Sequence, residues 1–151
     1  MPTILIDSEN EHHHISFYVY AGRNNGGRVS DRSRKCSMHI IVEINHGLAV
    51  IAPQGRFLGD KDSDEFAETI NRCIDQDNTR ILIDLGALDY INSMGLGSLI
   101  AGFIKTKSAG GLLVFANGNA RVNEMLQLTK TDTAIPVCAS IAEAKTMLLV
   151  P

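Results

Sequence analysis

The sequence has few of the features that mark membrane-spanning, nucleic-acid-binding or disulfide-stabilised proteins. It contains no tryptophan, only three tyrosines and five phenylalanines, and no apolar run of the roughly 18 residues that a bilayer span needs. Three cysteines, Cys36, Cys73 and Cys138, form no CxxC pair, which argues against a disulfide framework or a zinc site. The net charge of −3 gives no electrostatic reason to bind nucleic acid or an anionic membrane. We therefore expect a cytoplasmic protein that neither inserts into membranes nor binds nucleic acid.

Motifs for metal, nucleotide and catalytic chemistry are also scarce. The five histidines (12–14, His39 and His46) include three consecutive ones that cannot all face one ion, so no metal site is expected. The glycines of 55–59 and 95–97 match neither phosphate-binding loop pattern. No region combines a nucleophile, a base and an orienting group. The sequence therefore predicts a protein that is not an enzyme and needs no cofactor.

The first 37 of the 151 residues differ in character from the rest. The stretch RNNGGRVSDRSRKCS (23–37) has one sizeable apolar residue, Val29, and cannot bury enough surface to offset the entropy of ordering. We expect a flexible arm over 1–37, in which Ile15, Phe17 and Val19 alternate as in one short strand, and a single domain over 38–151. Because the arm holds five of the 14 basic and four of the 17 acidic residues, nine basic and thirteen acidic residues remain in the domain.

From residue 38 the apolar pattern switches between the strand and helix periods. Short β-branched or continuous apolar runs predict strands, with a tight turn at 45–47 joining the first two: 40–44, 48–52, 80–85, 112–116 and 135–138. Apolar residues at spacings of three and four predict helices: 62–75, 94–107, 120–129 and 140–150. A turn is expected at 89–90. The order β-β-α-β-α-β-α-β-α predicts an α/β fold with a mixed, largely parallel sheet covered by helices.

The most informative stretch lies where a strand gives way to a helix, at LDYINSMGLG (88–97). Asn92 or Ser93 is well placed to cap the helix. Gly95 and Gly97 leave its first turn without side chains, at a cost of roughly 1 kcal/mol each relative to alanine. Two explanations stay open at this point: the glycines let a partner's backbone approach closely, or they permit tight packing of the helix on the sheet.

The segments IDLGALDYINSMGLGSLI (83–100), AGGLLVFANGNARVNEMLQLT (109–129) and SIAEAKTML (140–148) resemble the STAS domain family, of the bacterial anti-sigma factor antagonist type. The resemblance covers about residues 38–149 and implies a STAS-like fold. It also implies that the chain binds an anti-sigma factor, a serine kinase with a histidine-kinase-like ATPase fold, and so regulates sigma-factor-dependent transcription. The residues it assigns to partner binding are those of the turn and a neighbouring loop: Asn92, Ser93, Met94, Gly95, Leu96, Gly97, Gly59 and Asp60.

The sequence departs from the family's D/N-S-S/T-G-L-G signature at the phosphoacceptor, which aligns with Met94. Methionine has no hydroxyl, so this position cannot be phosphorylated, and its flexible apolar side chain is suited to packing against a partner. Three interpretations follow. The chain is a constitutive binder, or Ser93 substitutes as the acceptor, or the domain has left the sigma-factor circuit for another interaction role. A serine committed to capping would be a poor nucleophile.

A second contact region is expected in the loop GRFLGDKDSD (55–64), which in the family neighbours the signature turn. Asp60 and Asp62 are its candidate acidic residues. The alternative is that these carboxylates stay in solvent and prepare the start of a helix, where the helix dipole favours negative charge.

Two alternatives to the anti-sigma factor antagonist stay open: a STAS subunit of a lipid ABC transporter and a small nucleotide-binding protein. The sequence does not fix the oligomeric state. We expect Gly95→Asp or Met94→Glu to weaken partner binding without harming the fold, because each adds a charge to the proposed contact face.

Overall fold

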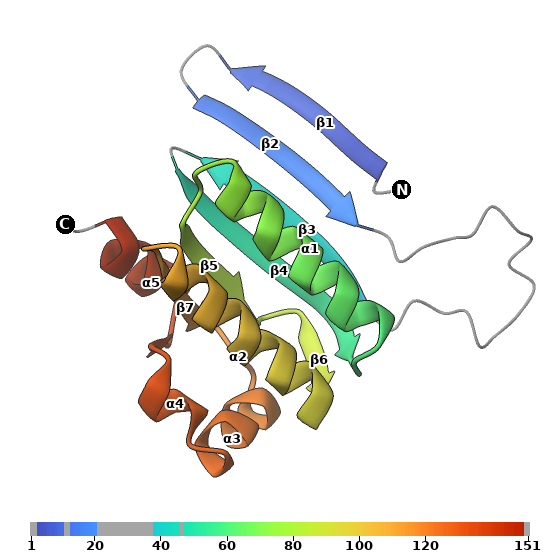
Figure 1. Ribbon diagram of the computed structural model, residues 1–151, viewed down its shortest axis with the longest axis vertical. Coiled ribbons are helices and arrows are strands. Elements are labelled where there is room, and N and C mark those ends of the chain that lie inside the picture. Colours follow the sequence, from blue (N-terminus) through green and yellow to red (C-terminus); the bar gives the residue numbers. More distant parts are fainter. Residues whose placement is uncertain (1–2, 11–12, 21–37, 46, 150–151) are drawn as a thin grey trace, which may run out of the picture.

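One mixed β-sheet organises the computed structural model of the chain (Figure 1), which describes residues 3–10, 13–20, 38–45 and 47–149, with side chains from Met38 onward. The strand order is β1-β2-β3-β4-β5-β7-β8, and β6 pairs with β4 outside this path. The strands are β1 (Thr3–Asn10), β2 (His13–Tyr20), β3 (Met38–Asn45), β4 (Leu48–Phe57), β5 (Arg80–Asp84), β6 (Leu88–Ile91), β7 (Leu112–Ala116) and β8 (Val137–Cys138).

The sheet has an antiparallel part and a parallel part that meet at β4. Strands β1 to β4 pair antiparallel in sequence order, and β3 and β4 are joined by a turn in which Gly47 has a φ of 80°. Every later pairing, β4 with β5 and β6, β5 with β7 and β7 with β8, is parallel. Parallel neighbours need crossover connections, which here contain helices. The predicted α/β class with a mixed, largely parallel sheet is confirmed.

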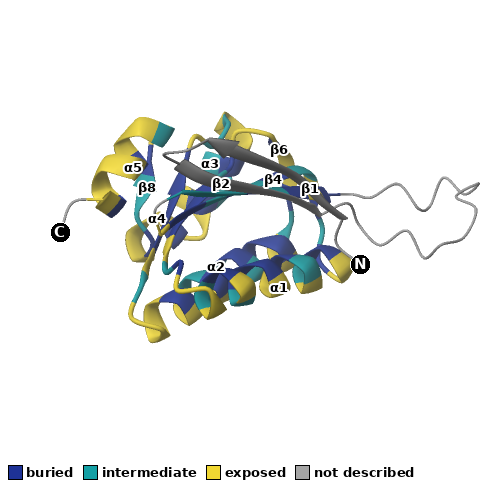
Figure 2. Ribbon diagram, turned by 90° about the horizontal axis from the view of Figure 1, so that it is seen from above, coloured by how far each residue is buried: buried dark blue, intermediate teal, exposed yellow. Residues whose placement is uncertain are grey.

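Two helices lie side by side along one face of the sheet (Figure 2), with their buried sides toward it. They are α1 (Lys61–Asp75) and α2 (Ser93–Ser108). Strand β5 shows how both faces are covered: Ile81 and Ile83 join the core beneath these helices, whereas Leu82 joins a second cluster with residues of α5 (Ile141–Leu149). α3 (Ala120–Leu128) contributes Val122 and Leu126 to the first cluster.

The N-terminal segments described by the structure are strands rather than irregular chain. β2 contains the predicted alternation at 15–19 and pairs with β3. β1 then pairs with the other side of β2. This backbone pairing explains why the two segments form strands, because a strand without a partner sheet is unstable. Residues 21–37 lie outside the described residues, so a flexible arm over 1–37 as a whole stays a prediction.

Several elements differ from the sequence expectation. β4 extends to Phe57 and α1 begins at Lys61, so of the loop expected at 55–64 only residues 58–60 lie between the two elements. Residues 88–91 form β6 where a turn was expected, because Arg56 and Phe57 of β4 extend far enough to pair with Tyr90 and Ile91. The expected strand 135–138 is shorter, since the helix α4 (Thr131–Ala134) directly precedes it and only Val137 and Cys138 pair with β7. In the described part of the chain, no helix has the length and apolar character to cross a membrane.

Candidate functional site

The turn between β6 and α2 is fixed by Asn92. Its side-chain Oδ1 accepts a hydrogen bond from the Gly95 N–H at 2.9 Å, which caps α2, and its Nδ2 donates to the Leu58 carbonyl oxygen at 2.9 Å. The Asn92 N–H also donates to the Phe57 carbonyl oxygen at 3.2 Å. These bonds join the helix start to the loop after β4, so the turn is held in one conformation from both sides.

Ser93 and Met94 follow at the first two positions of α2 and are exposed. The Met94 side chain is 56% accessible. Because Asn92 serves as the cap, the Ser93 hydroxyl is not used for that purpose, and it makes no hydrogen bond within the described part of the chain. The two residues therefore form the accessible corner of the turn.

Gly95 and Leu96 have a structural role. A Cβ on Gly95 would lie 2.5 Å from the Phe57 carbonyl oxygen and 2.9 Å from the Ile91 Cγ1, so the glycine lets α2 approach the end of β4. Leu96 belongs to the hydrophobic core. Both residues therefore lie at the turn but are buried. The expectation that Gly95→Asp would leave the fold intact is wrong, because the new side chain would collide with the Phe57 carbonyl oxygen.

Gly97, in contrast, is the open glycine of this turn. It is exposed, and a Cβ placed on it would meet nothing within 4 Å. It continues an exposed row along α2 that we call the α2 stripe, composed of Met94, Gly97, Ala101 and Ile104. These residues are spaced by three and four, and Ile104 is 58% accessible. The stripe carries no charge, and Lys105 and Lys107 lie beyond it in the last turn.

The loop after β4 lies directly against Met94. Gly59 is buried with a φ of +98°, a conformation that favours glycine, and a Cβ on it would lie 2.7 Å from the Met94 Cβ. The expected proximity of this loop to the turn is therefore confirmed. Asp60 is exposed beside it, whereas Asp62 is buried and accepts the Leu58 N–H at 3.3 Å. Asp62 lies in the first turn of α1, as the helix-start interpretation expects, but it is buried rather than in solvent, whereas Asp60 is accessible.

A contact between two serines ties α1 to α2 and was not predicted from the sequence. The Ser98 Oγ lies 2.6 Å from the Ser63 Oγ and 3.1 Å from the Met94 carbonyl oxygen. Neither serine belongs to a recognisable sequence motif. Their contact could not be predicted because the two residues are 35 positions apart in the chain. The bond fixes the first turn of α2 against α1 next to the exposed corner.

Cys73 and Asp84, which lie outside the Asn92–Gly97 turn, have structural surroundings. Groups of three or more His, Cys, Asp or Glu that could hold a metal ion are absent from the residues the structure describes. Burial raises the pKa of the Cys73 thiol to about 12, so it stays protonated and unreactive near neutral pH. Asp84, at the end of β5, accepts the Gly86 N–H at 2.9 Å, as expected of a structural carboxylate.

These features define an α/β domain that exposes an apolar helix start next to a closely packed loop. The chain belongs to the STAS domain family, whose model matches residues 39–144. The predicted family is therefore confirmed. No curated protein matches the sequence.

Solved structures share this fold at low sequence identity. An anti-sigma factor antagonist from Mycobacterium paratuberculosis is 21% identical with a TM-score of 0.66, over 74% of this chain and 94% of that one. A STAS domain protein from Planctomyces limnophilus is 21% identical with a TM-score of 0.62, over 74% and 98%. The Bacillus cell fate determinant SpoIIAA in its phosphorylated form is 17% identical with a TM-score of 0.57, over 72% and 97%.

Proposed function

We propose that this chain is an anti-sigma factor antagonist that binds an anti-sigma factor through Ser93, Met94 and the rest of the α2 stripe, with Asp60 at the edge of the contact. The observation that carries the proposal is the exposed Met94 side chain, 56% accessible on a turn held by hydrogen bonds from both sides. Because the backbone of the turn is already fixed, docking has to order only the Met94 side chain. The solved antagonist from Mycobacterium paratuberculosis supports this role by its shared fold.

The partner is a kinase-type anti-sigma factor, and the contact is not switched by phosphate at position 94. A phosphoryl group there would bring a charge of about −1.5 to −2 into the contact and oppose docking. Met94 has no hydroxyl to accept it, so the chain is a constitutive binder. Ser93 is the competing acceptor, and its exposed hydroxyl, unused in capping, makes it the residue to test.

The proposal gives the chain no reaction of its own and places it in the bacterial cytoplasm, where sigma factors act. Recognition therefore requires only shape and apolar contact from Met94 and its neighbours.

The binding test uses purified anti-sigma factors from the organism that carries this chain and isothermal titration calorimetry. We expect one of them to bind, and Met94→Glu to weaken that binding at least roughly tenfold, because the carboxylate would be desolvated in an apolar contact. Met147→Glu is the matched control: Met147 is 43% accessible on α5, away from the turn. Equal affinity for both variants would refute the contact, and no binding by any anti-sigma factor would refute the function.

The same proteins test the switch. The bound anti-sigma factor is incubated with ATP and the wild-type chain, and the tryptic peptide containing residues 92–97 is analysed by mass spectrometry. We expect no phosphate on Ser93, whereas Met94→Ser should restore an acceptor. Phosphate on Ser93 in the wild-type chain, lost in Ser93→Ala, would replace the constitutive interpretation with the substitute-acceptor one.

A further inference from the structure

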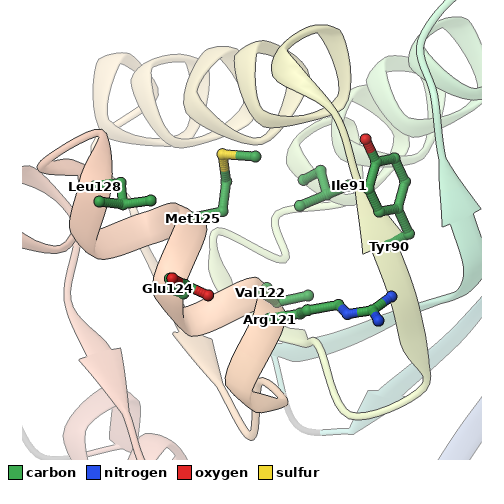
Figure 3. Close-up of a pocket in the computed structure, with 7 residues that line it drawn as sticks. All are labelled: Tyr90, Ile91, Arg121, Val122, Glu124, Met125 and Leu128. Carbon is green, nitrogen blue, oxygen red and sulfur yellow. The ribbon is translucent and has the colours of Figure 1, made fainter.

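A second accessible feature lies outside the Asn92–Gly97 turn, between β6 and α3 (Figure 3). It is a pocket of about 270 Å³ with an apolar floor and charged groups among its lining residues, which are Tyr90, Ile91, Arg121, Val122, Glu124, Met125 and Leu128. In the sequence these residues belong only to helix and strand patterns.

The volume and the lining indicate what the pocket can hold. At about 270 Å³ it falls just below the roughly 300–1,000 Å³ of typical small-molecule sites, so it suits one side chain better than a nucleotide. Leu128 is 75% accessible and Met125 is half-buried, so both present apolar surface to an incoming group. Methionine also adapts its shape to different neighbours. These properties favour an apolar side chain of a protein partner.

The pocket lining includes one cationic and one anionic residue, Arg121 and Glu124. Arg121 extends from α3 toward the strand that carries Tyr90 (Figure 3), and the Arg56 guanidinium lies 5.4 Å from the centre of the Tyr90 ring. No ion pair of Arg56 or Arg121 is found among the described residues, although Glu124 also lines the pocket. Unpaired guanidinium groups at an accessible edge favour a carboxylate on the partner.

The pocket is next in sequence to the Asn92–Gly97 turn. Tyr90 and Ile91 line it, and the next residue along the chain is Asn92, which caps α2. In Figure 1, α3, β6 and the start of α2 lie at the same end of the molecule. A partner seated on Met94 is therefore within reach of the pocket.

We infer that the pocket between β6 and α3 is a second docking site for the anti-sigma factor, and that it receives one apolar side chain flanked by an acidic residue of that partner. This inference rests on the proposed function. The apolar side chain contacts Met125 and Leu128, and the carboxylate pairs with Arg121. A buried apolar anchor beside a charged pair is a common arrangement at the centre of protein–protein contacts.

Two variants test the two halves of the inference against matched controls. Leu128→Glu places a charge on the apolar wall, and its control is Leu149→Glu, at a leucine that is 49% accessible on α5. Arg121→Glu reverses the pocket charge, and its control is Arg80→Glu, at the exposed first residue of β5. The affinity and association rate of the anti-sigma factor are measured by surface plasmon resonance, and far-UV circular dichroism checks that each variant folds.

We expect both pocket variants to weaken binding by roughly tenfold or more and both controls to stay within about twofold of the wild type. Arg121→Glu should also slow association most at low salt, because a charged pair steers the encounter. Wild-type affinity in both pocket variants, while Met94→Glu weakens binding, would overturn the pocket alone. Wild-type affinity in Met94→Glu as well would overturn the proposed contact at the turn.

Discussion

Gly95 and Gly97 stand two positions apart in the same helical turn, and the structure assigns them different roles. From their spacing alone, close partner approach and tight packing were equally open. The structure shows that Gly95 serves packing, because its Cα faces the Phe57 carbonyl oxygen, whereas Gly97 faces open space. Which glycine has which role depends on the position of β4, which the local sequence does not reveal.

This difference predicts opposite effects of the same substitution on stability. Gly95→Ala would place a Cβ 2.5 Å from the Phe57 carbonyl oxygen and should lower the free energy of unfolding by about 1–3 kcal/mol. Gly97→Ala meets nothing and should raise it by about 0.5–1 kcal/mol, since alanine has the higher helix propensity. Urea unfolding followed by circular dichroism measures both. A change of the same sign in the two variants would contradict the assigned roles.

The elements show how far sequence periodicity reaches. The helix expected at 62–75 is α1 (Lys61–Asp75), and the one expected at 94–107 is α2 (Ser93–Ser108), because long apolar periods identify amphipathic helices well. Strand β6 was missed because it has four residues and, among the described strands, pairs only with the end of β4. Pairing between distant segments decides such short strands, and no local pattern records it.

At the same scale, Asn92 joins α2 to the loop after β4. Asn92→Ala removes both the cap to Gly95 and the bond to the Leu58 carbonyl oxygen. It should lower the free energy of unfolding by about 2 kcal/mol, about 1 kcal/mol for each bond. Asn92→Ser keeps a capping oxygen and should lose about half as much. Chemical denaturation of the three proteins measures this order, and equal stability of Asn92→Ala and the wild type would show that the turn is held by other contacts.

For the whole molecule, the α/β class, the family and the order of the elements after residue 38, apart from β6 and α4, were predictable, because each follows from apolar periods and from motifs within one segment. The juxtaposition of Gly59 with Met94 was expected only from the family resemblance, and the Ser63–Ser98 contact and the pocket between β6 and α3 were not expected at all. Each joins residues from separate elements, so it depends on how the sheet brings those elements together.

The most direct measurement of the central claim is a ¹H–¹⁵N correlation spectrum of the labelled chain with and without the unlabelled anti-sigma factor. We predict that the amide signals of Ser93, Met94, Gly97 and Ala101 change most on binding, and that those of α5 stay in place. Changes confined to α5, or to strands far from the turn, would contradict the claim that the exposed start of α2 is where this domain meets its partner.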